Sequence, residues 1–197
     1  MYTRCNSMLQ MKRLALVSGG LILGIALWDW GNNELHPGQL AANLLDAVVQ
    51  QRFQAINPEF NGTTRLYSPS RGAHKILLLP ENPREAVLLS RVKAMGYRYK
   101  LGFYHIGAGY SRPGFSLLPG GATGYGYLAN EEMRSRIAAH AKTIKSGDRV
   151  DFQEGPWNVF VRPVCVQRAS CTNCHQGAKQ GQVMGAMVYF IRKPGSL

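Results

Sequence analysis

Two cysteines and a histidine stand close together near the end of the chain, in the segment Cys171-Thr172-Asn173-Cys174-His175. The spacing C-x-x-C-H is the pattern at which haem is covalently attached in c-type cytochromes. Two thiols at this spacing can reach the two vinyl groups of one haem, and the histidine after the second cysteine then lies under the iron. The sequence therefore predicts one covalent haem c, bound by Cys171 and Cys174, with His175 as the proximal axial ligand.

Non-haem chemistry is the alternative for the same residues. A C-x-x-C segment can be a dithiol redox pair or half of a zinc site, for which Cys165 and His175 would be the further ligands. The position of His175 and the export segment described below both favour haem. Cys165 has no evident partner, so no disulfide framework is expected, and a small buried hydrophobic residue is its simplest role. Paired catalytic carboxylates, a nucleophile elbow and a phosphate loop are missing from the sequence, so we do not expect an enzyme.

The first 30 residues have the pattern of an export signal or a membrane anchor. Lys12 and Arg13 precede an uncharged run over residues 14–28. The run is short for a membrane span, which needs about 20 apolar residues, and this favours a cleaved signal peptide. Trp28 and Trp30 would suit a membrane interface, which favours an anchor. Both alternatives place the rest of the chain, a linker over residues 31–39 and a domain over residues 40–197, on the periplasmic or extracytoplasmic side, where haem attachment takes place.

The composition is typical of one globular domain with a large excess of basic over acidic residues. The chain has 197 residues, 45% of them hydrophobic, and a formal net charge of +12. A basic surface favours acidic partners or anionic lipid. The cations are scattered singly and not interleaved with aromatic residues, so nucleic acid is not expected as a partner. The candidate partners are an acidic redox protein, the membrane through residues 14–28, and a second copy of the chain as a homodimer.

The elements that must position the motif alternate between helices and short strands. Helices are predicted over residues 40–53, from the N-cap Asn82 to Gly96, and over 130–145. In the first helix, Leu44 and Val48 are expected on the buried side and Asp46 on the polar side. Strands are predicted over 75–79, 97–104, 159–164 and 184–191, and the glycine-rich segment 107–126 is a functional loop or a hairpin.

These elements give an α+β fold with the haem motif in the connection between the last two strands. The simplest arrangement is an antiparallel sheet with helices on one side. Pro163 indicates that the strand over residues 159–164 lies at an edge of the sheet or near its own end.

The chain resembles the single-haem, PAS-like c-type domains found in periplasmic sensor proteins of bacteria. The similarity covers residues 36–192, and it is most specific in residues 162–164 (RPV), 171–175 (CTNCH) and 185–189 (GAMVY). The helix start at Asn82-Pro83, with Glu85 after it, is also similar. The resemblance implies a PAS-like antiparallel sheet flanked by helices, with Cys171, Cys174 and His175 holding the haem. Some members use a cysteine from an early helix as the sixth ligand, but this sequence has no cysteine between Cys5 and Cys165.

The sequence offers several candidates for the second axial ligand of the iron. His105 is the first candidate because it ends an aromatic strand directly before the glycine-rich segment. An open or water-bound position is the alternative. Arg162, Arg168 and Lys179 flank the motif and are candidates for binding the haem propionates. The weaker candidates for the sixth ligand are His36, His74, His140, Met133, Met184 and Met187.

The identity of the sixth ligand separates two functions. The first is a haem-based redox or small-ligand sensing module, because an open or displaceable position permits ligand binding. The second is a one-electron carrier or the haem subunit of a membrane electron-transfer complex, which the basic charge and the anchor would suit.

Overall fold

The structure is a computed structural model that describes residues 38–58, 78–106, 114–117, 131–175 and 177–192. For residues 114–117, Glu131 and Cys174 the description covers the backbone alone. The N-terminal hydrophobic segment, His36, His74 and most of the strand predicted over 75–79 lie outside the described residues. Within the described part, no helix is long and apolar enough to cross a membrane.

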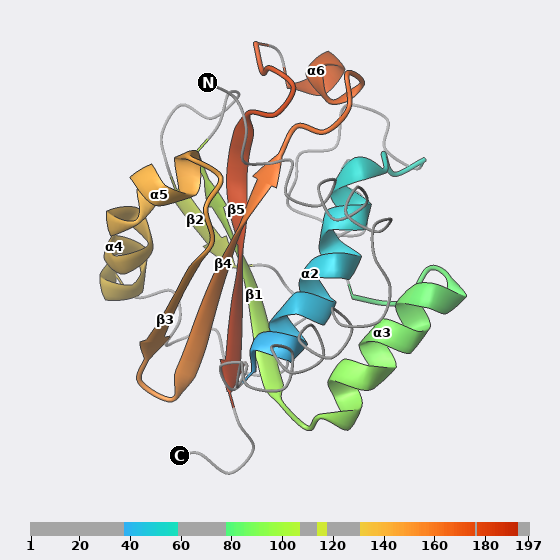
Figure 1. Cartoon of the computed structure of the whole chain (residues 1–197), viewed down its shortest axis with the longest axis vertical. Helices are drawn as coiled ribbons and strands as arrows, with labels where there is room; N and C mark the ends of the chain where they lie inside the picture. Colours follow the sequence, from blue (N-terminus) through green and yellow to red (C-terminus); the bar gives the residue numbers. More distant parts are fainter. Residues whose placement is uncertain (1–37, 59–77, 107–113, 118–130, 176, 193–197) are drawn as a thin grey trace, which may run out of the picture.

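A five-stranded antiparallel sheet forms the centre of the fold, in the order β2-β1-β5-β4-β3 (Figure 1). Strand β5 is the last in the chain but lies in the middle of the sheet, because its residues are apolar on both faces and all but the last are buried. The α+β class with an antiparallel sheet is confirmed. The strands are β1 Arg98–His105, β2 Gly114–Leu117, β3 Val150–Glu154, β4 Trp157–Cys165 and β5 Val183–Arg192.

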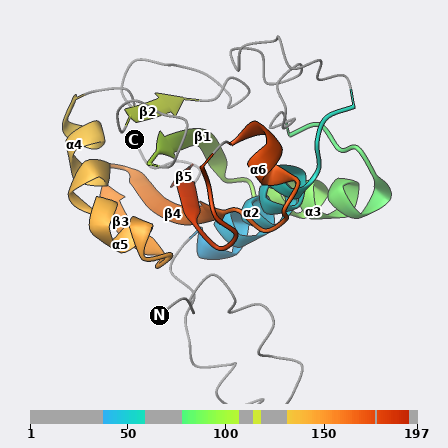
Figure 2. The ribbon, with the colours of Figure 1, turned by 90° about the horizontal axis from the view of Figure 1, so that it is seen from above.

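Helices cover both faces of the sheet. The pair α2 (Gln39–Gln54) and α3 (Pro83–Ala94) lies on one side, and the pair α4 (Glu131–Ala139) and α5 (Ala141–Lys145) lies on the other (Figure 2). The expectation of helices on one side was wrong. Helices are needed on both sides because β5 is apolar on both faces: Val188 and Phe190 pack toward α4 and α5, while Tyr189 and Ile191 pack toward α2.

The helix starts follow the local signals in the sequence. Asn82 caps α3, since its Oδ1 accepts a hydrogen bond of 2.9 Å from the N–H of Glu85, and Pro83 occupies the first helical position. Gly96 follows the helix with a φ of 70°, a conformation that favours glycine. The helix predicted over 130–145 is instead two helices, because the chain breaks at His140 between α4 and α5.

Helix α2 is rotated relative to the amphipathic pattern of its sequence. Leu45, Val48 and Val49 are fully buried, whereas Leu40 is 47% exposed. Asp46, which we expected on the polar side, is buried instead. A carboxyl group can occupy this position because the hydroxyl of Tyr189 on β5 donates a hydrogen bond of 2.9 Å to Asp46 Oδ1.

Pro163 was expected to mark either an edge strand or the end of its own strand, and it lies near the end of β4. Strand β4 is not an edge strand, since it pairs with β5 on one side and β3 on the other. The pairing with β3 ends at Val161, opposite Val150, so the β3 side of β4 is open at Pro163. A residue without an N–H is tolerated where no neighbouring strand needs it.

Gly185 is a position where the sheet tolerates no side chain. A Cβ there would lie 2.6 Å from Cζ of Phe103 and would also meet the backbone carbonyl oxygen of Tyr104. We expect Gly185→Ala to lower the free energy of unfolding by about 1–3 kcal/mol through overpacking. Gly181→Ala is the control: no atom lies within 4 Å of its Cβ, although its φ of 81° adds strain. Urea unfolding followed by circular dichroism compares the two, and a cost of Gly185→Ala well below about 1 kcal/mol would refute the packing argument.

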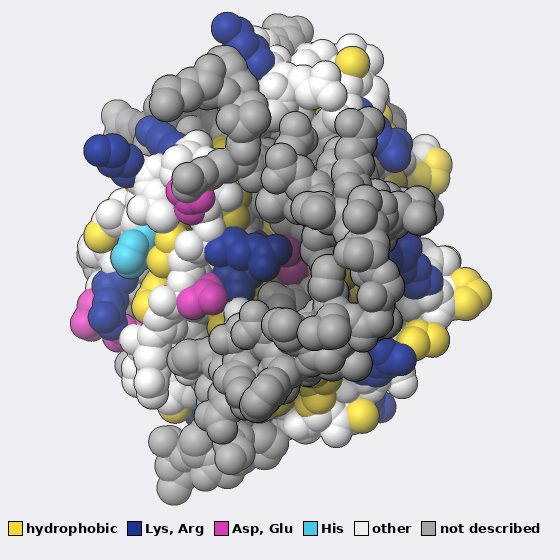
Figure 3. All heavy atoms as spheres, viewed as in Figure 1, with side chains coloured by type: hydrophobic (Ala, Val, Ile, Leu, Met, Phe, Trp, Pro, Cys, Tyr) yellow, Lys and Arg dark blue, Asp and Glu magenta, His cyan; other side chains and the backbone are white. Residues whose placement is uncertain are grey.

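Basic side chains are distributed over the surface of the domain. On the face seen in Figure 3, Lys and Arg side chains occur at several separate places, and Asp and Glu side chains are fewer. This distribution agrees with the net charge of +12.

Candidate haem site

The C-x-x-C-H motif lies in a closed connection between β4 and β5. The base of the connection is fixed by two backbone hydrogen bonds, from the N–H of Val166 to Gln182 O (2.9 Å) and from the N–H of Gly181 to Val166 O (2.7 Å). The short helix α6 (Cys171–Cys174) lies beyond the end of the sheet, on the side of α2 (Figures 1 and 2). The prediction that the motif lies between the last two strands is confirmed.

Cys171 and His175 lie one helical turn apart. The N–H of His175 donates a hydrogen bond of 3.0 Å to the carbonyl oxygen of Cys171, which brings the two residues to the same side of the turn. Cys171 is a half-buried free thiol that packs against a small apolar cluster of Val166, Ala178 and Met184. The thiol is therefore held beside apolar side chains, one helical turn from His175. The side chain of Cys174 lies outside the described part of the structure.

Both candidate axial histidines are disposed to be neutral. Burial lowers the pKa of the His175 imidazole below its usual 6.5, and burial lowers the pKa of His105 in the same way. A neutral imidazole keeps a nitrogen lone pair for a metal, whereas a protonated one cannot coordinate. At neutral pH both rings can therefore act as iron ligands.

His105 lies at the same end of the sheet as α6. It is the last residue of β1, and it is paired with Gly185 near the start of β5. Its ring meets the ring of Phe103 edge to face, at 4.9 Å, and Phe103 in turn lies 5.6 Å from the ring of Phe53 on α2. These contacts place the imidazole on the α2 side. The residue after His105 donates its N–H to the carbonyl oxygen of Met184, which belongs to the apolar cluster of Cys171.

The remaining described candidates for the sixth ligand are placed differently. His140 stacks on Phe152 at 5.7 Å on the side of α4 and α5, away from α6. Met133 and Met187 are almost fully buried in the two cores of the domain. His36 and His74 lie outside the described residues.

The three candidates for the propionates have different surroundings. Arg162 is buried on β4, where its guanidinium pairs with Asp151 of β3 and lies 5.4 Å over the ring of Phe160. Its charge therefore already has a carboxylate partner. Arg168 and Lys179 are exposed on the connection that carries α6. They are the better placed of the three to meet a carboxylate that reaches the surface.

Cys165 corrects an expectation from the sequence. It was expected to be unpaired, but it is disulfide-bonded. Cys171 is free, so it is not the partner of Cys165. A disulfide sulfur is not a thiolate, and Cys165 in this state is not available as a zinc ligand. Among the described residues, no group of three or more His, Cys, Asp or Glu side chains could hold a metal ion.

A buried polar cluster beside β4 and β5 was not foreseen from the sequence. Asp46 accepts hydrogen bonds from Tyr189 and from Gln50 (3.1 Å), and Gln50 also donates to the carbonyl oxygen of Pro163 (3.1 Å). Burial raises the pKa of the Asp46 carboxyl, and the hydrogen bonds from Gln50 and Tyr189 act against this. The periodicity of α2 did not indicate that Asp46 is buried, because Tyr189, its hydrogen-bond partner, is far away in the sequence.

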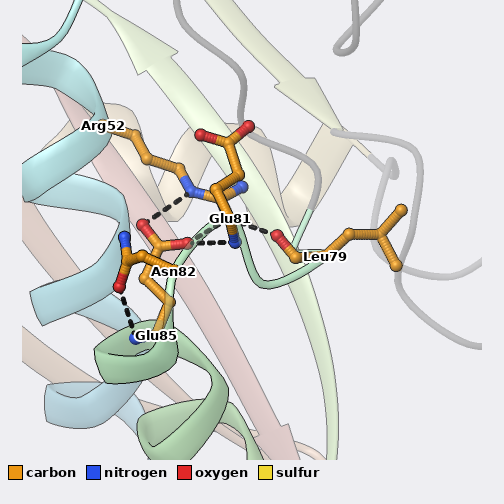
Figure 4. A network of polar contacts seen from close by, with 5 residues as sticks. All are labelled: Arg52, Leu79, Glu81, Asn82 and Glu85. Carbon is orange, nitrogen blue, oxygen red and sulfur yellow. Dashed lines mark hydrogen bonds and ion pairs between the residues drawn. The ribbon is translucent and has the colours of Figure 1, made fainter.

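A second polar network joins α2 to the start of α3 (Figure 4). The guanidinium of Arg52 forms an ion pair of 2.8 Å with Glu85, and the two side chains are only 5% and 2% exposed. Arg52 also donates to the carbonyl oxygen of Leu79, and Glu85 accepts the backbone N–H of Glu81 at 2.9 Å. The network fixes the chain where it enters α3, and Glu85, which the sequence indicated only as part of a helix cap, is its centre.

No family model, curated protein or solved structure matches the chain.

Proposed function

We propose that the chain is an exported c-type haem protein whose single haem serves a redox or small-ligand sensing module. One observation carries the proposal. Cys171 and His175 are both half-buried and lie one helical turn apart at the end of the sheet, and the free thiol of Cys171 packs against an apolar cluster. Attachment needs a reduced thiol, and axial ligation needs a neutral imidazole.

The chemistry of these residues fits a haem. Cys171 supplies one thiol for a thioether, and His175 supplies a nitrogen whose lowered pKa keeps it unprotonated. Cys174 would supply the second thiol, which requires that it is not held in the disulfide of Cys165. Phe53 and Phe103 offer aromatic surface on the α2 side of the sheet, next to His105. An apolar surrounding of this kind limits the access of water to a bound haem.

The chain's own groups would do three things. Cys171 and Cys174 would bind the haem covalently at α6, His175 would supply a nitrogen to its iron, and the exposed Arg168 and Lys179 would pair with its propionates. The haem supplies a one-electron couple or a position for a small ligand, depending on the group opposite His175. The antiparallel sheet with flanking helices supports the PAS-like architecture that the sequence resemblance implies.

His105 is the proposed distal ligand, and its replacement gives a spectroscopic prediction. We expect His105→Ala to convert a six-coordinate, low-spin ferric haem to a high-spin or water-bound one, because the imidazole nitrogen is lost. The absorption spectrum of the purified holoprotein measures this. His140→Ala is the matched control, since His140 is also half-buried but lies on the other face of the sheet. A low-spin spectrum unchanged in His105→Ala would remove His105 from the iron.

Electron transfer is the second candidate function, favoured by the net charge of +12. It predicts fast electron exchange with an acidic partner, which added salt slows. Exchange rates that do not depend on ionic strength would contradict this candidate.

A pyridine haemochrome spectrum, recorded on protein made with a haem-attachment system, tests the proposal itself. We expect the spectrum of haem with both vinyl groups saturated, retained after acidic acetone extraction. A change of the ferrous spectrum on addition of CO would favour sensing, and an unchanged spectrum would favour electron transfer. Protein without covalent haem would overturn the proposal.

A further inference from the structure

The ring of Phe103 on β1 lies directly beside the ring of His105. The two residues are separated by one position in the strand, so their side chains lie on the same face of the sheet. Their rings meet edge to face, with centroids 4.9 Å apart and planes at 72°. Phe103 is only 8% exposed, whereas His105 is half-buried. The imidazole therefore has a buried aromatic ring as its wall on one side.

Phe103 can take this position because residue 185 is a glycine. Gly185 on β5 is paired directly with His105. A Cβ at Gly185 would lie 2.6 Å from Cζ and 2.9 Å from Cε1 of Phe103, so the Phe103 ring lies across the space that a side chain opposite His105 would take. On the side of α2, the ring of Phe53 lies 5.6 Å from that of Phe103. The Phe103 ring is therefore enclosed between β5 and α2 and is held against His105.

A wall of this kind restricts the orientation of the imidazole. A histidine side chain has three staggered positions about χ1 and a broad range about χ2. A neighbouring ring that is fixed at contact distance excludes the orientations directed toward it. Because His105 then keeps fewer orientations before it binds a metal, it loses less conformational entropy when its nitrogen binds.

We propose that Phe103 is the positioning residue of the distal ligand: it holds His105 in the orientation that binds the iron, and it thereby sets how readily a small ligand displaces His105. This role depends on the proposed function, in which His105 binds the iron opposite His175. Phe103 and His105 belong to a strand that is paired on both sides, with β2 and β5, so their backbone positions are fixed relative to each other. Preorganising one side chain changes an equilibrium constant by about three- to ten-fold.

Electron paramagnetic resonance of the ferric holoprotein tests the orientation of His105. The g values of a low-spin ferric haem with two imidazole ligands depend on the angle between the planes of the two rings. We expect one sharp set of g values in the unaltered chain and a broadened or second set in Phe103→Leu, because the His105 ring then takes more than one orientation. Phe103→Met fills more of the space and is the second variant if Phe103→Leu does not fold.

Titration of the ferrous holoprotein with CO tests the displacement of His105. CO competes with His105 for the iron, so its apparent affinity falls as His105 is bound in a larger fraction of the molecules. We expect Phe103→Leu to bind CO about three- to ten-fold more tightly than the unaltered chain, and His105→Ala to bind it more tightly still. A CO affinity that Phe103→Leu does not change, or CO that binds neither protein, would overturn the proposal.

Phe190→Leu is the matched control for both measurements. Phe190 on β5 is also a buried core phenylalanine, but it packs on the side of α4 and α5, away from His105. Its replacement should lower the stability of the domain and leave the g values and the CO affinity unchanged. Equal changes in Phe190→Leu, or g values unaltered in Phe103→Leu, would overturn the proposal. Protein without covalent haem would instead overturn the proposed function itself, which the haemochrome spectrum shows separately.

Discussion

Replacing Arg52 by methionine is expected to lower the free energy of unfolding by about 3–5 kcal/mol. Glu85 would then keep a charge at a position only 2% exposed, without the guanidinium that compensates it. The carbonyl oxygen of Leu79 would lose its donor as well. Urea unfolding of the full chain, followed by far-ultraviolet circular dichroism, measures the change.

The control for this effect is an ion pair of similar chemistry at the surface. Arg136 pairs with Glu154, but its side chain is 48% exposed. Arg136→Met should therefore cost less than about 1 kcal/mol. If Arg52→Met costs no more than this control, the buried network does not hold α2 and α3 together. The double variant Arg52→Met/Glu85→Leu should recover much of the loss, because it leaves no buried charge unpaired.

The stabilisation by this pair should also depend on pH in one direction. Burial would raise the pKa of Glu85, but hydrogen bonds from Arg52 and Glu81 and the charge of Arg52 lower it below 4.5 in the folded state. The contribution is therefore fully present above the unfolded pKa and is lost as the pH falls through the lower, folded pKa. The stability difference between the unaltered chain and Glu85→Gln should shrink below about pH 4.5. A difference that stays constant down to the acid transition would contradict the lowered pKa.

Local signals in the sequence were sufficient for most elements but not for their arrangement. The cap at Asn82, the alternation before His105 and the apolar run of β5 each depend on neighbouring residues, and each element was predicted. The central place of β5 depends on pairing with both β1 and β4 across the whole chain. Strand β3 was missed although its burial alternates, because it has only five residues and carries polar side chains.

The same division applies to the candidate site. The sequence placed Cys171 and His175 in one motif of five residues, but the helical turn that they share was not predicted. The surroundings of Arg162 could not be predicted, because its partner Asp151 lies on the strand that was missed. The buried place of Asp46 likewise depends on Tyr189, which is 143 residues away in the chain. Long-range contacts of this kind leave no periodic signal.

Removing the cysteines of the motif is expected to have the largest effect on the proposed function. In Cys171→Ser/Cys174→Ser we expect no haem to remain after denaturation and acidic acetone extraction, because both thioether bonds are gone. Each single variant should keep haem through one bond, with a haemochrome spectrum shifted toward that of a haem with one free vinyl group. Haem-stained denaturing gels and haemochrome spectra of all three variants measure the outcome.

Cys165→Ser is the matched control, and it also decides how the disulfide relates to haem attachment. If the partner of Cys165 is Cys5, this variant should bind haem as the unaltered chain does. If the partner is Cys174, the disulfide withholds one of the two thiols, and Cys165→Ser should raise the yield of doubly attached haem. A loss of covalent haem in Cys165→Ser equal to that in the double variant would contradict both cases. Attachment would then depend on Cys165 itself, which the spacing of the C-x-x-C-H motif does not provide for.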